Sequence, residues 1–310
     1  MNPLAPFFEK YGFAMLDGGL STQLERLGAN MEGELWTSRV LVERPDLLQT
    51  ACQQFLESGA DVVATATYQA SVDGFLRAGL KQQQARTLMR KAIELAVSAR
   101  DEFWSQPGNR AGRLRPLVAA SLGPYGACLH DGSEYHGNYA IGLPELVEFH
   151  RQRIGFLADA GADIFAFETF PSLLEAQAVF EVLPEFPEIT AWISFSCRDD
   201  QHVAHGESFA ECAALAAQQE QIVAVGVNCL PPENVTPLLK SAEGCGLPLV
   251  VYPNSGEHWD AEAQQWRGQV CGDMDVGAWH RHGARLIGGC CRTDSDDIRG
   301  MRASLEAALR

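Results

Sequence analysis

Three cysteines near the ends of two predicted strands have the residue type and placement of a metal site. Cys229 lies just past one short apolar run, and Cys290 and Cys291 follow another such run after Gly288 and Gly289. Thiolates are soft ligands that select zinc, and three protein ligands leave the fourth tetrahedral position open. Neighbouring residues of a regular strand point to opposite faces, so the two glycines would let the backbone turn until both sulfurs face one centre. The sequence therefore predicts an open zinc site on three cysteines.

The residues alone leave other interpretations of these cysteines open. The three side chains could be inert core residues, because free cysteine is often buried. A Cys290–Cys291 disulfide would be strained and would not persist in a reducing compartment. Cys197, which also ends a predicted strand, could form an alternative site with His202 and His205. The remaining cysteines are expected in helices (Cys52, Cys212) or in loops (Cys128, Cys245, Cys271).

The elements that must position these cysteines alternate along the chain. Short runs that are apolar on both faces are typical of parallel strands covered by helices. These runs are residues 13–16, 61–65, 117–120, 164–167, 190–195, 222–227, 249–252 and 284–287. Helical patterns fall at residues 47–57, 82–100, 145–160, 173–183, 209–219, 235–242, 273–282 and 296–309, with a weakly marked one around 21–27. This alternation predicts a single (β/α)8 barrel of the TIM type, with residues 1–310 as one domain. A doubly wound open sheet is the alternative, but no GxGxxG or Walker loop occurs.

Polar and small residues follow the predicted strands, whereas few of that kind lie at the strand starts. Asp17, Gly18 and Gly19 come after the first strand, and Glu168 comes after the fourth. In (β/α)8 barrels these ends form the face on which active sites lie. The asymmetry predicts an enzyme.

The composition excludes several other classes of protein. The chain of 310 residues has a net charge of −16, which argues against nucleic acid because phosphate binding requires basic surfaces. It contains no apolar run of about 18 residues, so we expect no membrane span, and its N-terminus does not resemble a signal peptide. Nine cysteines, an odd number, fit a reducing cytoplasm better than a disulfide framework. We therefore expect a cytoplasmic protein whose partners are small molecules.

Five short motifs occur in a fixed order along the chain. They are Asp17-Gly18-Gly19, Glu168-Thr169, Gly226-Val227-Asn228-Cys229, Tyr252-Pro253-Asn254-Ser255-Gly256 and Gly288-Gly289-Cys290-Cys291. This ordered set resembles the zinc-dependent homocysteine S-methyltransferases, over about residues 16–292. The resemblance implies a barrel whose three-cysteine zinc binds the homocysteine thiol and passes a methyl group to it, giving methionine.

The resemblance also implies roles for individual residues. The implied zinc ligands are Cys229, Cys290 and Cys291, and the implied homocysteine-binding residues are Asp17, Gly18, Gly19 and Glu168. The residue types agree with these roles, because glycine N–H groups allow a carboxylate to approach closely and Glu168 can accept hydrogen bonds from an ammonium group. Two ordinary interpretations also fit: Glu168 as a solvated or paired carboxylate, and Asp17 as a loop cap.

Members of the family differ in their methyl donor. Betaine-using relatives carry a C-terminal extension and the cobalamin-dependent synthase carries further modules, whereas this chain stops one helix after Cys291. It is therefore most similar to the stand-alone enzymes that use S-methylmethionine. We expect S-adenosylmethionine as a second donor and keep betaine as the alternative.

The chemistry of such a site can be argued independently of the resemblance. A free thiol with a pKa of about 8.5 is only a few per cent thiolate at pH 7, and ligation to zinc deprotonates it. Attack of a thiolate on a sulfonium removes charge, and exclusion of water favours that reaction. Four aromatic side chains could contact a sulfonium through their rings or serve only as packing: Trp36, Tyr68, Tyr125 and Tyr252.

Two other classes of function remain as alternatives. A zinc-containing barrel hydrolase would require histidine and carboxylate ligands with a metal-bound water. A non-catalytic zinc-binding protein would require a closed site with four ligands. The predicted strand ends offer sulfur in an open arrangement, which favours the methyltransferase. The sequence leaves the oligomeric state open, a monomer included.

Overall fold

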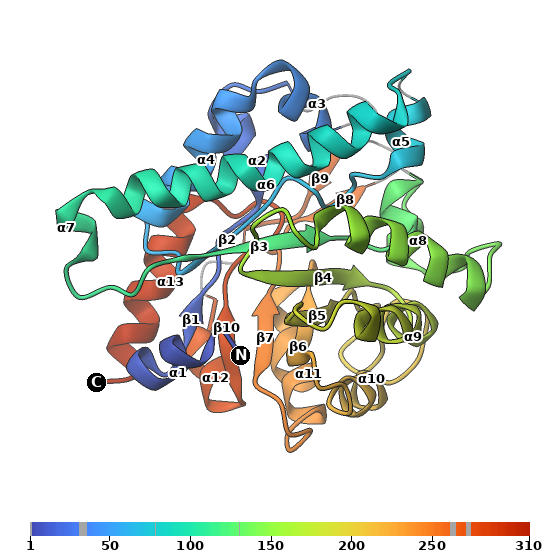
Figure 1. The fold of residues 1–310 in the computed structure, drawn as a ribbon. Helices are drawn as coiled ribbons and strands as arrows, with labels where there is room; N and C mark the ends of the chain where they lie inside the picture. Colours follow the sequence, from blue (N-terminus) through green and yellow to red (C-terminus); the bar gives the residue numbers. More distant parts are fainter. Residues whose placement is uncertain (1, 31–35, 78, 130, 261–264, 271–273) are drawn as a thin grey trace.

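The computed structural model describes residues 2–310 apart from 31–35, 78, 130, 261–264 and 271–273. Eight parallel strands form one sheet in the order β1-β10-β7-β6-β5-β4-β3-β2, curled into a nearly closed barrel (Figure 1). The strands are β1 (Ala14–Met15), β2 (Val62–Ala64), β3 (Leu117–Leu122), β4 (Ile164–Phe170), β5 (Ala191–Phe195), β6 (Ile222–Asn228), β7 (Leu249–Tyr252) and β10 (Ala284–Ile287). Each coincides with one of the eight predicted strands, and the (β/α)8 fold class is confirmed.

The two strands at the ends of this order, β1 and β2, are joined through carboxylates as well as backbone. Asp61 N–H donates to Met15 O at 2.7 Å, and Asp61 Oδ2 accepts from Met15 N–H at 3.0 Å. Asp17 Oδ2 accepts from Ala64 N–H at 2.7 Å. In a regular sheet, backbone carbonyl groups would accept these hydrogen bonds between β1 and β2. Here the carboxylates of Asp61 and Asp17 accept them instead. Asp17, one of the predicted substrate residues, therefore also helps to close the barrel.

Helices cover the outside of the barrel. Nine of them are α2 (Leu20–Arg26), α4 (Pro45–Glu57), α6 (Gln82–Ser105), α8 (Leu143–Leu157), α9 (Leu173–Val182), α10 (Phe209–Ala216), α11 (Val235–Ser241), α12 (Val276–Arg281) and α13 (Ser295–Ala308). All nine match predicted helical patterns, although residue 273, the predicted start of α12, lies outside the described residues. Local signals fix some of the starts: Ser172 caps α9, and Ser208 forms a capping box with Glu211 at α10.

Several short elements were not predicted. They are α1 (Ala5–Tyr11), α3 (Trp36–Glu43), α5 (Val72–Arg77), α7 (Pro107–Arg110), the hairpin β8–β9 (His258–Asp260 and Gln265–Arg267), and four 3₁₀ helices: η1 (Gly126–Cys128), η2 (Ser133–Tyr135), η3 (Leu183–Glu185) and η4 (Pro232–Asn234). None of these helices exceeds eight residues, which is less than the window of about 11 residues in which helical periodicity is assessed. Length is not the whole reason, because α2, α11 and α12 have six or seven residues and were predicted.

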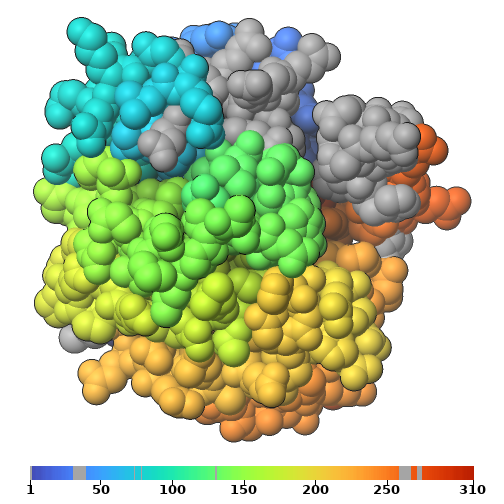
Figure 2. All heavy atoms as spheres, turned by 90° about the vertical axis from the view of Figure 1, so that its right-hand side faces the viewer, coloured from blue at the N-terminus to red at the C-terminus, as the bar shows by residue number. Residues whose placement is uncertain are grey.

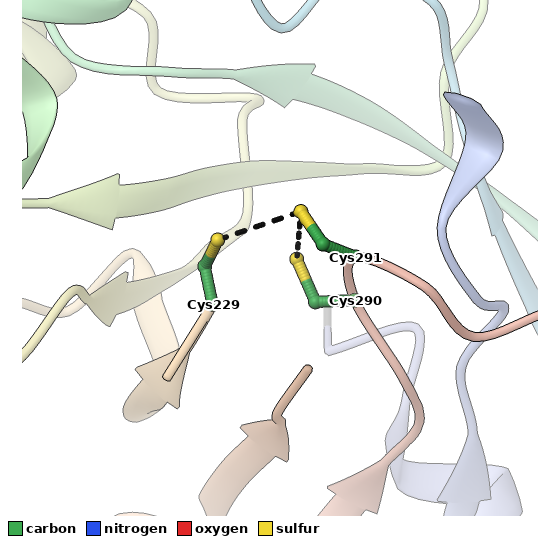
Figure 3. Close-up of side chains that lie close together, drawn as sticks. All are labelled: Cys229, Cys290 and Cys291. Atoms are coloured by element: carbon green, nitrogen blue, oxygen red, sulfur yellow. Dashed lines mark hydrogen bonds between the residues drawn. The ribbon is translucent and has the colours of Figure 1, made fainter. Parts of the chain in front are cut away.

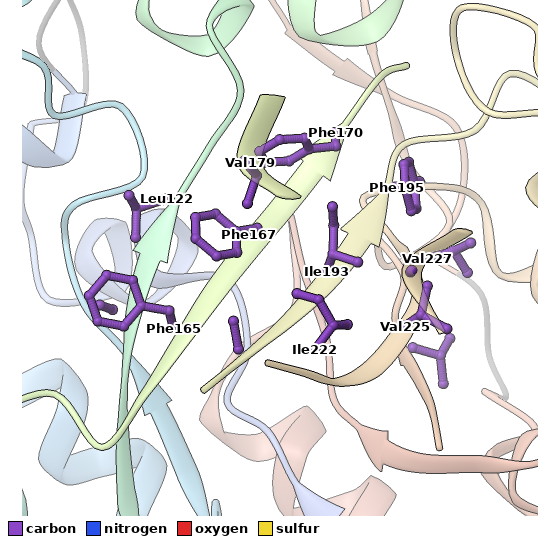
Figure 4. Packing of buried hydrophobic residues seen from close by; sticks show 14 of the residues in the cluster. Leu122, Phe165, Phe167, Phe170, Val179, Ile193, Phe195, Ile222, Val225 and Val227 are labelled. Atoms are coloured by element: carbon purple, nitrogen blue, oxygen red, sulfur yellow. The ribbon is translucent and has the colours of Figure 1, made fainter. Parts of the chain in front are cut away.

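The apolar core has two layers separated by the strands. Alternate residues of β4 show this: Phe165 and Phe167 pack outward toward the helices, with Val179 of α9 among their neighbours (Figure 4). Ala166 faces inward, where it joins a smaller cluster that includes Leu4 of α1. This alternation follows from the two-residue period of a strand. Within the described residues, no helix combines the length and apolarity that crossing a membrane would require.

Candidate metal and substrate site

The three predicted cysteines converge at the strand ends of the barrel. Cys229 directly follows β6, while Cys290 and Cys291 lie three and four residues past the end of β10. The Sγ atoms of Cys229 and Cys291 are 3.7 Å apart, and those of Cys290 and Cys291 are 4.0 Å apart. Figure 3 shows the three sulfurs pointing toward one another. In the described part of the chain, this is the one group of three or more potential ligand side chains whose ligand atoms all lie within 4.8 Å of one another.

The electrostatics of the cluster favour a thiolate. Hydrogen bonds from the thiols of Cys290 and Cys291 lower the pKa of Cys229 well below its usual value. The same interactions, together with burial, raise the pKa of the other two thiols. Three sulfurs this close cannot all ionise without a compensating positive charge. The arrangement therefore fits a metal cation at its centre.

The backbone of Cys229 is held in an unusual conformation. Its φ is +54°, in the left-handed region that non-glycine residues seldom adopt. The N–H of Cys229 donates to Tyr252 O of the neighbouring strand β7 at 3.1 Å. Such conformations cost roughly 1–3 kcal/mol and concentrate at functional sites. At this position the turn directs the sulfur to the cluster.

The two glycines before Cys290 serve a purpose different from the predicted one. Neither has a positive φ, so conformational freedom is not their role. A Cβ at Gly288 would lie 2.6 Å from Leu16 Cβ, and one at Gly289 would lie 2.2 Å from Thr293 Oγ1. Both positions therefore require glycine for close packing against neighbouring segments. This packing brings the end of β10 against the end of β1.

The loop after β1 also lies directly against the cysteines. A Cβ at Gly19 would be 2.5 Å from Cys290 O. The N–H of Gly19 donates to Thr293 O at 3.0 Å and lies 3.3 Å from Thr293 Oγ1. The Gly19 amide is thus already hydrogen-bonded within the protein. Burial raises the pKa of Asp17, in the same loop, to about 7, against the opposing effect of its hydrogen bond from Ala64.

Glu168 lies on β4, inside the barrel mouth. Its Oε1 accepts a short hydrogen bond from Ser121 Oγ, and Tyr252 also hydrogen-bonds to this carboxylate. Burial raises its pKa, while the two hydroxyl donors oppose the rise. The side chain is half-buried and fixed in orientation. These contacts make it a preorganised acceptor at the same end of the barrel as the cysteines.

The structure also brings residues to this site that the sequence did not indicate. Tyr135 Oη, from η2, lies 3.6 Å from Cys229 Sγ. Tyr68 has its pKa raised by burial, by Glu134 and by Cys229, so its hydroxyl shares their surroundings. Burial raises the pKa of Glu134 to about 7, and the nearby Cys229 adds to the rise. Tyr68 was considered only as one of four aromatic candidates. The sequence after β3 was interpreted only as a loop and did not indicate Tyr135 or Glu134, because both act on residues that are distant in the sequence.

The alternative site at Cys197 is not formed. Cys197 Sγ lies 3.8 Å from the backbone oxygen of Phe195. His202 pairs with Asp199 and His205 pairs with Glu207, each at 3.0 Å. The remaining cysteines are placed as follows: Cys52 and Cys212 are buried in helices, Cys128 is buried, Cys245 is half-buried, and Cys271 lies outside the described residues. Cys290 and Cys291 are free thiols, so no disulfide joins them.

Comparisons with known proteins agree with this geometry. A family model described as homocysteine S-methyltransferase matches residues 14–305. The chain is 45% identical over 307 residues to the homocysteine S-methyltransferase YbgG of Bacillus subtilis, covering 98% of both proteins. It is 43% identical to the homocysteine S-methyltransferase of Escherichia coli, covering 97% of this chain and 98% of that protein. The crystal structure of the metallated form of the Escherichia coli homocysteine methyltransferase MmuM superposes with a TM-score of 0.87 at 41% identity, covering 97% of this chain and 99% of that one.

Proposed function

Because the chain belongs to the homocysteine S-methyltransferase family and transfers a methyl group to homocysteine, we propose that a zinc ion held by Cys229, Cys290 and Cys291 serves this reaction. We further propose S-methylmethionine as the methyl donor and S-adenosylmethionine as a second donor. The observation that carries the proposal is the convergence of three thiols at the barrel mouth. Since an oxidising compartment would convert such thiols to disulfides, we place the enzyme in the cytoplasm.

The spacing of the sulfurs supports zinc. Tetrahedral zinc with Zn–S bonds of about 2.3 Å has sulfur–sulfur edges of about 3.8 Å. The two measured separations, 3.7 and 4.0 Å, bracket that value. Three thiolates are also the soft donor set that zinc prefers. When bound, zinc supplies the Lewis acidity that keeps the homocysteine thiol deprotonated as the nucleophile.

Residues of the chain itself bind and orient the amino-acid part of homocysteine. Glu168, held by hydroxyl groups, accepts from the ammonium group. Asp17 Oδ2 is taken by Ala64 N–H, so the ammonium would approach Oδ1. The Gly18 amide donates to the carboxylate, since the next amide is already bonded within the protein. Orientation of this kind converts a bimolecular reaction into an effectively intramolecular one.

The charge change of the reaction supports a sulfonium donor. A thiolate and a sulfonium yield two neutral thioethers, so charge disappears in the transition state. A half-buried site with little water favours a reaction of that charge type. The alternative donor is betaine, a quaternary ammonium compound, and the assay below must distinguish it from the sulfonium donors.

A methionine-formation assay tests the proposal. Zinc-loaded enzyme receives homocysteine and, separately, S-methylmethionine, S-adenosylmethionine or betaine. We expect the highest kcat/KM with S-methylmethionine, with two methionines formed per homocysteine consumed because the demethylated donor is itself methionine. Faster turnover with betaine than with either sulfonium would overturn the assignment of the donor. Full activity after complete removal of zinc would overturn the assignment of the metal.

A further inference from the structure

One buried carboxylate at this site has an oxygen without a hydrogen-bond partner in the described structure. Glu134, in η2 after β3, is only 8% exposed, and its Oε2 makes no hydrogen bond within the described structure. The ion pairs found among the described residues do not include it. A buried charge without a partner costs several kcal/mol. Proteins retain such groups where a ligand supplies the missing charge, so the natural counterpart of Glu134 is a cation.

The position of Glu134 relates it directly to the thiol cluster. Its backbone oxygen accepts from Ser196 Oγ at 3.0 Å, which ties η2 to the end of β5. The next residue, Tyr135, places its hydroxyl 3.6 Å from Cys229 Sγ. A Cβ at Gly126 would lie 2.5 Å from Glu134 N, so η2 packs tightly on η1. The backbone of η2 that carries Glu134 is therefore held beside the cluster by contacts on two sides.

The surface view agrees with this placement. The arrows of β3 and β4 point to the right in Figure 1, and Figure 2 shows that side of the molecule. Green atoms of the segment after β3 lie at the centre of that face in Figure 2. The segment that contains Glu134 is therefore part of the face toward which these strands end. Glu134 belongs to the segment but turns its carboxylate inward, as its burial shows.

We propose that Glu134 binds the cationic sulfonium centre of the methyl donor, in a subsite that Tyr68 and Tyr135 share beside Cys229. This inference rests on the function proposed above. Both tyrosines interact electrostatically with Glu134 and with Cys229, so their rings lie in the same surroundings. Aromatic rings attract cations and reinforce a carboxylate in that role. Asp17, in the loop after β1, and Glu168, on β4, are the residues proposed above to bind homocysteine, and the donor subsite does not include them.

The balance of the reaction determines what this carboxylate contributes. The homocysteine sulfur forms a bond to the methyl carbon while the bond from that carbon to the donor sulfur breaks. The electron pair of the broken bond stays on the donor sulfur, which becomes a neutral thioether. Attraction to Glu134 is thus strongest in the bound donor and fades as the methyl group transfers. Such an interaction lowers the donor KM without raising kcat. Because the demethylated product is neutral, Glu134 no longer attracts it, which favours its release.

The variant Glu134→Gln tests this role, because glutamine keeps the shape and removes the charge. Steady-state rates are measured on zinc-loaded enzyme with S-methylmethionine varied at saturating homocysteine, and then with the two exchanged. We expect the KM for S-methylmethionine to rise at least tenfold, with kcat unchanged or raised, because the lost attraction is strongest in the bound donor. The KM for homocysteine should change less than twofold. The matched control is Glu188→Gln, which removes the same charge from an exposed position just before β5 and should leave all three constants unchanged.

An uncharged inhibitor separates charge recognition from loss of structure. Homoleucine has the shape of S-methylmethionine with a neutral CH group in place of the sulfonium. Its inhibition constant against S-methylmethionine should be the same for the parent enzyme and Glu134→Gln, whereas a damaged pocket would weaken both ligands. An unchanged donor KM, or an equal rise in the KM for homocysteine, would overturn the inference. Absence of S-methylmethionine turnover in the parent enzyme would instead contradict the proposed function.

Discussion

Asn228 and Thr169 exchange two hydrogen bonds across the end of β5. Thr169 N–H donates to Asn228 Oδ1, and Asn228 Nδ2 donates to Thr169 Oγ1, both at 2.8 Å. Thr169 has a φ of +64°, the same left-handed region as Cys229. One amide side chain thus links the residue after Glu168 to the residue before Cys229. The metal-binding and substrate-binding parts of the site therefore share one support.

We expect Asn228→Ala to weaken both stability and homocysteine binding. The substitution leaves buried donors of Thr169 and Ser194 without their acceptor, which costs about 1–3 kcal/mol for each unsatisfied group. The KM for homocysteine should rise roughly tenfold, because 1.4 kcal/mol of lost orientation corresponds to that factor. Urea unfolding and steady-state kinetics measure the two effects. Ser194→Ala removes only one of these bonds and should cause a smaller loss; equal losses in both variants would argue against a shared support.

The three cysteines should be individually essential for metal binding but not for folding. Cys229→Ser, Cys290→Ser and Cys291→Ser are each expected to lose zinc and at least a hundredfold in activity, because a hydroxyl is a poor ligand for zinc. The circular-dichroism spectrum should stay unchanged, since none of the three is a buried core residue and only Cys290 packs against the edge of the inner core cluster. Metal analysis of the purified variants provides the measurement. Cys245→Ser, remote from the cluster, is the control, and full zinc content in Cys290→Ser would show the assignment to be wrong.

Glu168→Gln should impair homocysteine binding without removing the metal. The amide keeps an acceptor for Ser121 but loses the negative charge that faces the ammonium group. We expect the KM for homocysteine to increase by about ten- to a hundredfold, in the range of a lost charge-assisted hydrogen bond. Zinc content should equal that of the parent enzyme. If the KM for homocysteine does not change, Glu168 is only a paired structural carboxylate.

Homocysteine binding should release about one proton. The free thiol is protonated near pH 7, and it must lose that proton to become a metal ligand. Isothermal titration calorimetry in several buffers of different ionisation enthalpy measures the number of protons released. Heat that is independent of the buffer would count against direct coordination of the thiolate.

Asp17→Asn should stabilise the protein at alkaline pH. Burial raises the pKa of Asp17 to about 7 from an ordinary value of 3.8. The folded state therefore binds more protons than the unfolded state between these values, and stability is lost as the pH rises through that window. Asparagine does not titrate and avoids the loss. The melting temperature of the variant should match that of the parent near pH 4 and exceed it at pH 8. The corresponding gain in the free energy of unfolding at pH 8 is about 1–2 kcal/mol once solvent screening is allowed for. The same variant should bind homocysteine poorly, and an advantage that shrinks as the pH rises would contradict the linkage.

The barrel and its cysteines could be predicted from the sequence because their signals are local. Strands buried on both faces produce uninterrupted apolar runs, so β3 to β7 and β10 were found within a few residues of their limits. Parallel strands in such a barrel end on one face. Cysteines that follow two of these strands were therefore expected to lie close together, and the Sγ separations confirm it. The helices α1, α3, α5 and α7 were not predicted, although α2, α11 and α12, which have six or seven residues, were.

Only the tertiary structure decided how the site is completed. Glu134 and Tyr135 reach the cysteines from a loop about a hundred residues earlier in the chain, and no local pattern encodes where such a loop folds. The structural role of Gly288 was missed for the same reason, because the atoms that exclude a Cβ there belong to Leu16 and Asp17, far away in the sequence. Sequence periodicity fixes which face of each element is buried, whereas contacts between distant segments depend on packing in three dimensions. The sequence therefore indicated the cysteines that converge, whereas their supports and the buried Oε2 of Glu134 became apparent only in the folded chain.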